Sequence, residues 1–294
     1  MTAIVNGINV SSYATDYKDM HLTYAWRTAA PECLGVGCFM TPFILHSASV
    51  TEITGHGTTL RLAGAKGVPR FDKPAEEAAW EKAVDLLPMI DTTRDTIAGT
   101  WTHTEKGLTC SAEAFARLEI PYKPAEEYDY KMVFSYASGE PEVHQFVSMD
   151  KSSFQWCLNG WKKGFENCAS FQSFDRYPKD TVNPSTAYLP VFFKPNQLHT
   201  SVVMVRRKVA SAYLDGQCVS YLRIGGVADG HPILNWSMPT KGILGVGSNK
   251  CAITIQRLEV LEINGKGTKV DAAELRKIQA LAPQREPNTK DDPF

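Results

Sequence analysis

The sequence predicts an all-β protein, an antiparallel two-sheet sandwich accompanied by a partial second sandwich. Three observations support this fold class. Segments rich in β-branched and aromatic residues recur through residues 99–263, with turn residues about every 8–12 positions, as in sandwich domains. One stretch of the chain is repeated. Helical periodicity is confined to two short segments.

The repeat relates two segments of the chain. Residues 19–60 align without a gap with residues 229–270, with 13 identities in 42 positions, where average residue usage would give about two or three by chance. The first copy lacks the long N-terminal partner segment that precedes the second. We therefore expect residues 1–66 to be equivalent to the C-terminal half of a complete domain at residues 91–267.

Turn residues and periodicity place the elements in order. In the first copy, Asn6-Gly7 aligns with Asp215-Gly216, a signal for a two-residue hairpin turn. Residues 67–90 are expected to be a linker with one short helix over Lys73–Leu87, which ends before Pro88. The strands of the complete domain are predicted at residues 99–102, 116–120, 128–134, 145–148, 154–158, 200–206, 210–214, 217–222 and 252–263. The tail at 268–294 has helix potential over Ala272–Ile278 and is expected to be partly disordered.

Charge and hydropathy exclude two classes of partner. A net charge of −1 and a pI near 6.7 give no basic footprint for nucleic acid. No apolar run approaches 18 residues, so membrane insertion is not expected. The N-terminus has no export signal. The localisation stays open: cytoplasmic as written, extracytoplasmic if the chain is a piece of a longer protein.

The cysteines predict neither a metal nor a cofactor. The chain has 7 cysteines, an odd number, and the closest pairs are Cys33 with Cys38 and Cys157 with Cys168. Neither pair is accompanied by the second Cys/His pair of a zinc site, and no calcium-type acidic loop is visible. Buried thiols in a reducing compartment and a Cys157–Cys168 disulfide remain the two alternatives.

Several motifs in order resemble one known family. They are Asp85–Asp91, Gly99–Trp101, Ala116–Tyr122, Glu127–Tyr130, Asn159–Trp161, Tyr213–Gly216, Leu244–Gly247 and Leu258–Ile263. Residues ~85–267 thereby resemble the concanavalin A-like, laminin-G-type lectin domain common in planctomycete multidomain proteins. The resemblance implies a jelly-roll sandwich for the complete domain. It implies no particular activity, because one fold hosts many functions.

The segment 154–165 carries the best candidate site. Alternation puts Phe154, Trp156 and Leu158 on one strand face and Gln155, Cys157 and Asn159 on the other. Trp161 follows in a turn, where a ring is hard to bury. A flat ring flanked by polar donors suits the apolar face and hydroxyls of a sugar. The predicted ligand-binding residues are Trp161, Asn159, Gln145, His144 and Asp175. In the alternative interpretation, Trp161 only caps the sandwich edge.

The sequence favours recognition over catalysis. Glu127 and Asp129 share a strand face, but the third acid of a sandwich glucanase motif is replaced by Met132, and no catalytic residue is predicted. The glycines of Leu244–Gly247 are expected at a tight crossing between sheets. The function expected is a non-enzymatic module that binds a glycan or a protein partner. A glycan-processing hydrolase and a structural subunit are the alternatives. A half-sandwich exposes an apolar face, so self-association or a protein partner is expected for residues 1–66.

Overall fold

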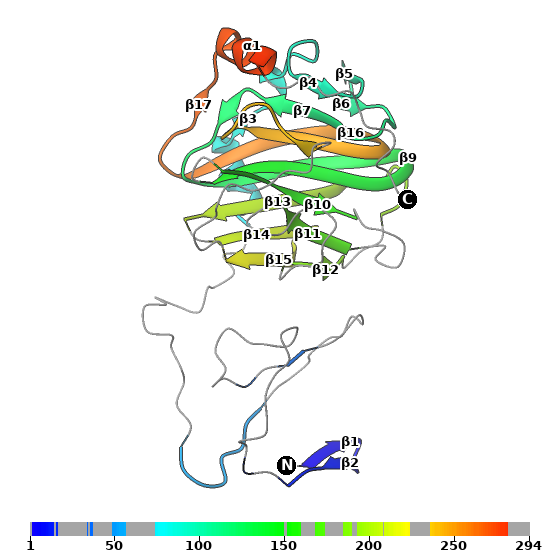
Figure 1. The fold of residues 1–294 in the computed structure, drawn as a ribbon, viewed down its shortest axis with the longest axis vertical. Coiled ribbons are helices and arrows are strands. Elements are labelled where there is room, and N and C mark those ends of the chain that lie inside the picture. The colour runs from blue at the N-terminus through cyan, green and yellow to red at the C-terminus, as the bar shows by residue number, and fades with distance from the viewer. Residues whose placement is uncertain are drawn as a thin grey trace. The chain divides into compact units, whose positions relative to one another are not determined.

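A computed structural model describes residues 2–14, 16, 34, 36–37, 49–56, 74–149, 152–159, 168–173, 185–189, 193–207, 209–223 and 236–281. Internal contacts divide the chain into a unit of Met1–Arg70 and a unit of Phe71–Phe294. Figure 1 shows the strands of both units. Among the described residues, no helix is long and apolar enough to cross a membrane.

The described part of the first unit is centred on one hairpin. Strand β1 (Thr2–Val5) pairs antiparallel with β2 (Ile8–Ser12). The Asn6-Gly7 turn between them has φ angles of 50° and 77°, and the Asp215-Gly216 turn has 50° and 78°. Both are two-residue turns with positive φ at both positions, as the Asn-Gly and Asp-Gly pairs predict. Most of residues 19–60 lie outside the described residues, and the repeat stays a prediction.

The second unit is a two-sheet antiparallel sandwich, as predicted. Strands β9 (Glu127–Met149) and β16 (Leu244–Asn264) pair along their length, with bulges, and take part in both sheets. Gly139 of β9, with a φ of 89°, lies opposite Cys251 at the bend between the two parts. An added Cβ there would lie 2.0 Å from the Lys250 carbonyl oxygen, so the bend requires glycine.

Each sheet contains one part of the β9–β16 pair and adds further strands on both sides of it. The first sheet adds β7 (Ala116–Ile120) and β4 (Thr96–Ala98) beside β16, and β10 (Ser152–Leu158), β11 (Cys168–Gln172) and β12 (Ala187–Tyr188) beside β9. The second sheet adds β13 (His199–Arg206), β14 (Val209–Leu214) and β15 (Gln217–Arg223) beside β9. Beside β16 it adds β3 (Val84–Asp85), β6 (Gly107–Cys110) and β5 (Trp101–Thr104). These strands cover the nine predicted segments.

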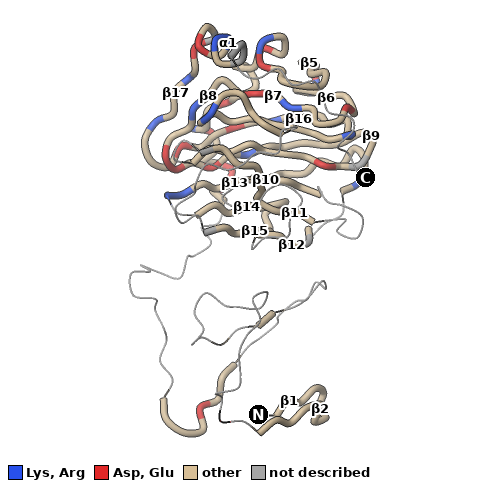
Figure 2. Tube along the Cα trace, viewed as in Figure 1, with Lys and Arg blue, Asp and Glu red and all other residues tan. Residues whose placement is uncertain are grey.

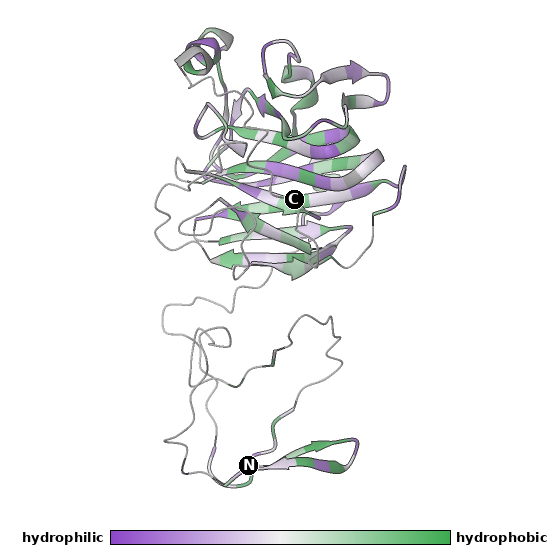
Figure 3. Ribbon diagram, turned by 45° about the vertical axis from the view of Figure 1, so that its right-hand side comes forward, coloured by the Kyte–Doolittle hydropathy of each residue, from purple (hydrophilic) through white to green (hydrophobic). Residues whose placement is uncertain are grey.

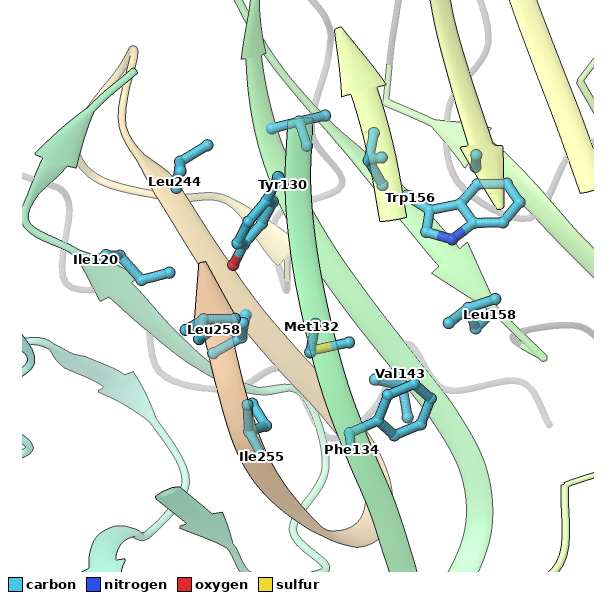
Figure 4. Packing of buried hydrophobic residues seen from close by; sticks show 14 of the residues in the cluster. Ile120, Tyr130, Met132, Phe134, Val143, Trp156, Leu158, Leu244, Ile255 and Leu258 are labelled. Atoms are coloured by element: carbon cyan, nitrogen blue, oxygen red, sulfur yellow. The ribbon is translucent and has the colours of Figure 1, made fainter. Parts of the chain in front are cut away.

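The core lies between the two sheets and has contributions from both. Trp156 and Leu158 of the first sheet and Tyr130, Phe134 and Leu258 of the second are each fully or almost fully buried in it. Figure 4 shows these side chains turned toward one another. Alternating hydropathy along the sandwich strands (Figure 3) is the pattern that buries one face of each strand.

The structure differs from the sequence prediction in the segment Lys73–Leu87. The predicted helix over Lys73–Leu87 is a shorter 3-10 helix, η2 (Glu77–Lys82), followed by β3 and a second 3-10 turn, η3 (Leu87–Met89). Strand β3 pairs with β16, and Leu86 is buried in the core. Tertiary pairing overrides the helical pattern here, and residues 84–90 belong to the sandwich rather than to a linker.

The tail begins as predicted. Strand β17 (Thr268–Lys269) pairs with β8 (Tyr122–Lys123), and helix α1 covers Ala272–Leu281 with Leu275 buried. The rest of the predicted tail lies outside the described residues.

The outer surface of the second sheet, the back face, is closed by η2. Trp80 of η2 packs on Val202, Met204 and Tyr213. Lys131 of β9 lies beneath the Trp80 ring, 4.1 Å from its centroid, and its ammonium lies 3.0 Å from Glu259. Figure 2 shows that both acidic and basic residues are scattered over the sandwich.

Candidate functional site

The outer surface of the first sheet, the front face, is polar but buried. The register of β9, β10 and β11 places Val143, Gln145 and Val147 toward the core together with Phe154, Trp156 and Leu158, as the alternation of β10 predicts. The intervening side chains form the front face: His144, Phe146, Ser148, Gln155, Cys157, Ser170 and Gln172. All seven are less than 9% exposed. Desolvating so many polar groups has a cost, which makes their hydrogen bonding informative.

Residues 236–243 lie on this face. Glu119 of β7 accepts hydrogen bonds from the Thr240 amide at 2.6 Å and the Thr240 hydroxyl at 3.0 Å. Arg117 donates to the Ser237 carbonyl at 2.9 Å. Burial lowers the pKa of the Arg117 guanidinium to about 10, so it stays charged at neutral pH. Two charged side chains therefore fix residues 236–243 against the sheet.

The packing of Trp236 and Met238 explains the two glycines of Leu244–Gly247. Gly247 lies opposite His144, and an added Cβ would approach the Trp236 ring to 2.9 Å. At Gly245 it would approach Met238 to 2.5 Å. The expectation of a crossing between sheets was wrong. These glycines instead let side chains of segment 236–243 lie directly on the outside of the sheet.

Three side chains with metal-ligand chemistry converge under Trp236. Glu142 and His144 stand two residues apart on β9, and Cys157 of β10 lies directly opposite His144. His144 Nε2 is 2.9 Å from Glu142 Oε1 and 3.8 Å from Cys157 Sγ. The three ligand atoms all lie within 4.8 Å of one another. The Trp236 ring lies 3.8 Å, centroid to centroid, from the imidazole.

Two glutamines beside this cluster have unused carbonyl oxygens. Gln155 and Gln172 are directly opposite each other on β10 and β11 and are 1% and 0% exposed. Their amide nitrogens donate to Ser173 Oγ at 3.4 Å and to Ser170 Oγ at 2.9 Å. Both Oε1 atoms have no hydrogen-bond partner. A buried acceptor without a donor costs about 1–3 kcal/mol, so these oxygens are suited to a water or a ligand hydroxyl.

Two of the predicted ligand-binding residues, His144 and Gln145, leave the sheet on opposite sides. His144 is on the front face, and Asn159 follows β10 with a φ of 56°. Gln145 points into the core, where it donates to the Tyr130 carbonyl at 3.2 Å and accepts from Ser201 Oγ at 2.6 Å. Adjacent residues of a strand face opposite sides, so Gln145 cannot share a site with His144, and we do not retain it. Trp161 and Asp175 lie outside the described residues.

The predicted alternatives for the cysteines are also resolved for one pair. Cys157 and Cys168 are both buried and are not joined in a disulfide. Cys157 is opposite Ser170, so the two cysteines are diagonal neighbours on adjacent strands. Diagonal residues are about 7–8 Å apart, whereas the two Cβ atoms of a disulfide are about 3.5–4.5 Å apart. Cys33 and Cys38 lie outside the described residues.

A cavity opens where the front face ends. Its volume is about 490 Å³, and its lining is formed by Lys123, Pro124, Ala125, Glu126, Ser148, Met149, Lys241 and Gly242. Ser148 pairs with Ser153 near the start of β10, while Asn159 follows its end. The cavity is therefore about 20 Å from Asn159 of the predicted site, at about 3.3 Å per strand residue.

Sequence reasoning missed both the cavity and the Glu142–His144–Cys157 cluster. The cavity is lined by residues from three separate parts of the chain, a combination that no local pattern reveals. The cluster had a partial signal, because Glu142 and His144 at positions i and i+2 share a strand face. The third member depends on the register of β10.

Comparisons with known proteins complete this description. No family model matches the chain, and no curated protein matches it. Among solved structures, the carbohydrate-binding module CBM66 from Bacillus subtilis is similar with 12% identity and a TM-score of 0.40, over 56% of this chain and 92% of that one. The Crh5 transglycosylase in complex with NAG has 14% identity and a TM-score of 0.45, over 62% and 84%. The Caenorhabditis elegans galectin LEC-6 has 9% identity and a TM-score of 0.35, over 59% and 100%. At this level of similarity, no activity transfers to the present chain.

Proposed function

We propose that the unit Phe71–Phe294 is a non-enzymatic carbohydrate-recognition module of the lectin type. The observation that carries the proposal is the cavity of about 490 Å³ at the end of the front face. Its volume falls within the range of about 300–1,000 Å³ that is usual for small-ligand sites. One or two sugar rings are the ligand size that fits it.

The chemistry of the lining supports a sugar. Pro124, Ala125 and Met149 supply apolar surface, which suits the C–H face of a sugar ring. Lys123, Lys241 and Ser148 supply hydrogen-bonding groups at the same cavity. A few polar groups on a largely apolar wall are the usual composition of a site that orients a polar ligand.

The charges of the lining favour binding over hydrolysis. Glycoside hydrolysis uses two carboxyl groups on either side of the scissile bond. Among the described lining residues, Glu126 is the one carboxylate, and it forms an ion pair with Arg207 at 3.1 Å. Of the two acids considered from the sequence, Asp129 is buried on the back face and pairs with Arg206 at 2.8 Å.

The experiment is a glycan-array screen of the purified full chain, followed by titration of the best hit. Lys123→Ala and Lys241→Ala are expected to weaken binding by about 10-fold each, the equivalent of one hydrogen bond from a charged group. The matched control is Lys106→Ala, which removes an exposed lysine from the turn between β5 and β6. No reducing sugar is expected to be released from the bound glycan.

Two outcomes would overturn this proposal. One is an array without a hit. The other is a hit whose affinity is the same in both cavity variants as in the control. Release of reducing sugar would favour the alternative hydrolase.

A second function, assembly, is favoured by the unit Met1–Arg70. The side chains of Ile4, Ile8 and Val10 in its hairpin are 64%, 66% and 58% exposed. Neighbouring exposed apolar side chains are typical of contact surfaces. We propose that this hairpin contacts a protein partner or another copy of the chain. Light scattering of the full chain and of an Ile4→Ser/Ile8→Ser variant tests self-association, which a monomeric full chain would exclude.

A further inference from the structure

We propose that Glu142, His144 and Cys157 form a Zn²⁺ site on the front face of the sandwich. This site is separate from the sugar cavity and does not depend on the proposed function. The ion would be held by one carboxylate oxygen, one imidazole nitrogen and one thiolate sulfur.

Strand geometry brings the three ligands together. Glu142 and His144 alternate with core residues on one strand, so both side chains leave the sheet on the same side. Cys157 on the neighbouring strand is the direct cross-strand partner of His144. Paired strands are rigid, and a site on them is more exactly positioned than one on loops.

The distances agree with coordination of a common ion. Tetrahedral zinc with bonds of about 2.0–2.3 Å sets its ligand atoms about 3.4–3.6 Å apart. The observed separations are 3.8 Å between Cys157 Sγ and His144 Nε2 and 2.9 Å between His144 Nε2 and Glu142 Oε1. The Glu142 and Cys157 ligand atoms lie within 4.8 Å of each other, so the Glu142 carboxylate must shift toward the thiol to bind the same ion. The Glu142 side chain is 14% exposed, which gives it room to move and gives the ion a path from solvent.

The same distances argue against a nucleophilic triad. In a triad, one imidazole nitrogen faces the nucleophile and the other faces the orienting carboxylate. Here a single atom, His144 Nε2, contacts both Cys157 Sγ and Glu142 Oε1. Three atoms aimed at one point is the arrangement that a cation requires.

The donor set selects zinc among the divalent ions. Thiolate is a poor ligand for Mg²⁺ and Ca²⁺, which prefer oxygen, whereas sulfur, nitrogen and oxygen donors together suit Zn²⁺. Binding replaces the thiol proton of Cys157, which is released to solvent. With three ligands from the described residues, the fourth position would be filled by water or by a ligand.

Neighbouring residues hold two of the ligands in place. Asn249 donates from Nδ2 to the other Glu142 oxygen at 2.8 Å, which leaves Oε1 directed at His144. The imidazole is covered by Trp236 and lies 6.3 Å, centroid to centroid, from the Phe146 ring. Residues that orient metal ligands and exclude water are a regular part of zinc sites.

The experiment uses the full chain, stripped with a chelator and then titrated with Zn²⁺ or Co²⁺. One metal ion per chain is expected. The Co²⁺ form is expected to show a sulfur-to-cobalt charge-transfer band and the visible bands of tetrahedral cobalt. Cys157→Ser should abolish the charge-transfer band and weaken Zn²⁺ binding by more than about 100-fold, beyond the effect of losing a supporting residue.

The matched control is Cys168→Ser, which removes another buried thiol of the same sheet and should keep the band. Glu142→Gln covers the case in which Cys157→Ser does not fold: it should keep the band and bind Zn²⁺ at least about 10-fold more weakly. The proposal is overturned if the wild-type chain binds no stoichiometric metal, if both cysteine variants behave alike, or if Glu142→Gln binds like wild type. The Lys123→Ala and Lys241→Ala variants should bind Zn²⁺ normally. The zinc proposal and the sugar-binding proposal can therefore be tested independently of each other.

Discussion

The two outer faces of the sandwich bury polar groups in different ways. On the back face, Lys131 is 2% exposed and pairs with Glu259 at 3.0 Å and Glu77 at 3.3 Å, beneath the Trp80 ring. On the front face, Gln155 and Gln172 are as deeply buried but have carbonyl oxygens without donors. Charges that are fully paired stabilise a fold, whereas acceptors left without donors do not.

This difference separates a structural surface from a candidate functional one. The back face is completed by this chain's own η2, which contributes both Trp80 and Glu77. The front face offers unused acceptors, a cluster of Glu, His and Cys, and a cavity at its end. Groups that a protein leaves incompletely satisfied are suited to water, an ion or a ligand.

The largest expected effect is on the back face. Lys131→Ala should lower the free energy of unfolding by about 3 kcal/mol, near the lower end for breaking a buried ion pair, because both partners are partly exposed. Urea unfolding of the full chain measures it, with Lys106→Ala as the exposed control. A loss as small as that of the control would mean that the back face is not held by this pairing.

A substitution on the front face should have the next largest effect on stability. Gly247→Ala places a Cβ about 2.9 Å from the Trp236 ring and 3.0 Å from the Ala116 carbonyl oxygen. Overpacking of this kind should destabilise the protein by about 1–3 kcal/mol. In a Trp236→Leu background the same change should be less costly, because the ring is gone. Equal costs in both backgrounds would show that Trp236 does not rest on Gly247.

Three glutamine variants test the comparison directly. Gln145→Leu removes two satisfied hydrogen bonds and leaves the buried Ser201 hydroxyl without its acceptor, so it should cost about 1–3 kcal/mol. Gln155→Leu and Gln172→Leu each remove one bond and one unsatisfied acceptor, and should stay within about 1 kcal/mol of wild type. Chemical denaturation of all three gives the ranking. A front-face variant as costly as Gln145→Leu would reveal an ordered water or ion at that oxygen.

The smallest effect depends on pH. The hydrogen bond from Arg257 holds the pKa of Glu77 below its usual value of 4.5. A lowered pKa gives stability that is present above the unfolded pKa and is lost as pH falls through the folded one. Glu77 is 70% exposed, so its contribution should be below about 1 kcal/mol. The stability difference between wild type and Glu77→Gln should therefore be constant at neutral pH and shrink progressively as pH falls below the usual value of 4.5. A difference that persists in acid would contradict this origin.

Much of the fold followed from local pattern. Alternation of apolar and polar residues assigned Phe154, Trp156 and Leu158 to one face of β10, and the structure buries that face in the core. The Asp215-Gly216 turn and the tail helix were predicted for the same reason, since both depend on residues adjacent in sequence. The segment after Glu76 was misread because pairing with β16 outweighs helix propensity.

The candidate site was less predictable. Gln145 and His144 were assigned to one site, although consecutive strand residues point to opposite faces. The cavity required Lys123, Ser148 and Lys241, which are distant in sequence, to meet at one edge. Cys157 was assessed for zinc by spacing to other cysteines, but its partners, Glu142 and His144, reach it across a strand pair.

The sequence by itself determined which residues form strands and which side of each strand is apolar, because both are set by short-range periodicity. It also determined that segments 19–60 and 229–270 resemble each other. Only the tertiary structure decided that the polar groups on the outer faces of the two sheets have such different partners. Strand register placed His144 opposite Cys157, and packing of η2 brought Glu77 and Trp80 to Lys131. Contacts between residues far apart in the chain are not encoded in any local pattern, and the functional distinction between the two faces rests on them.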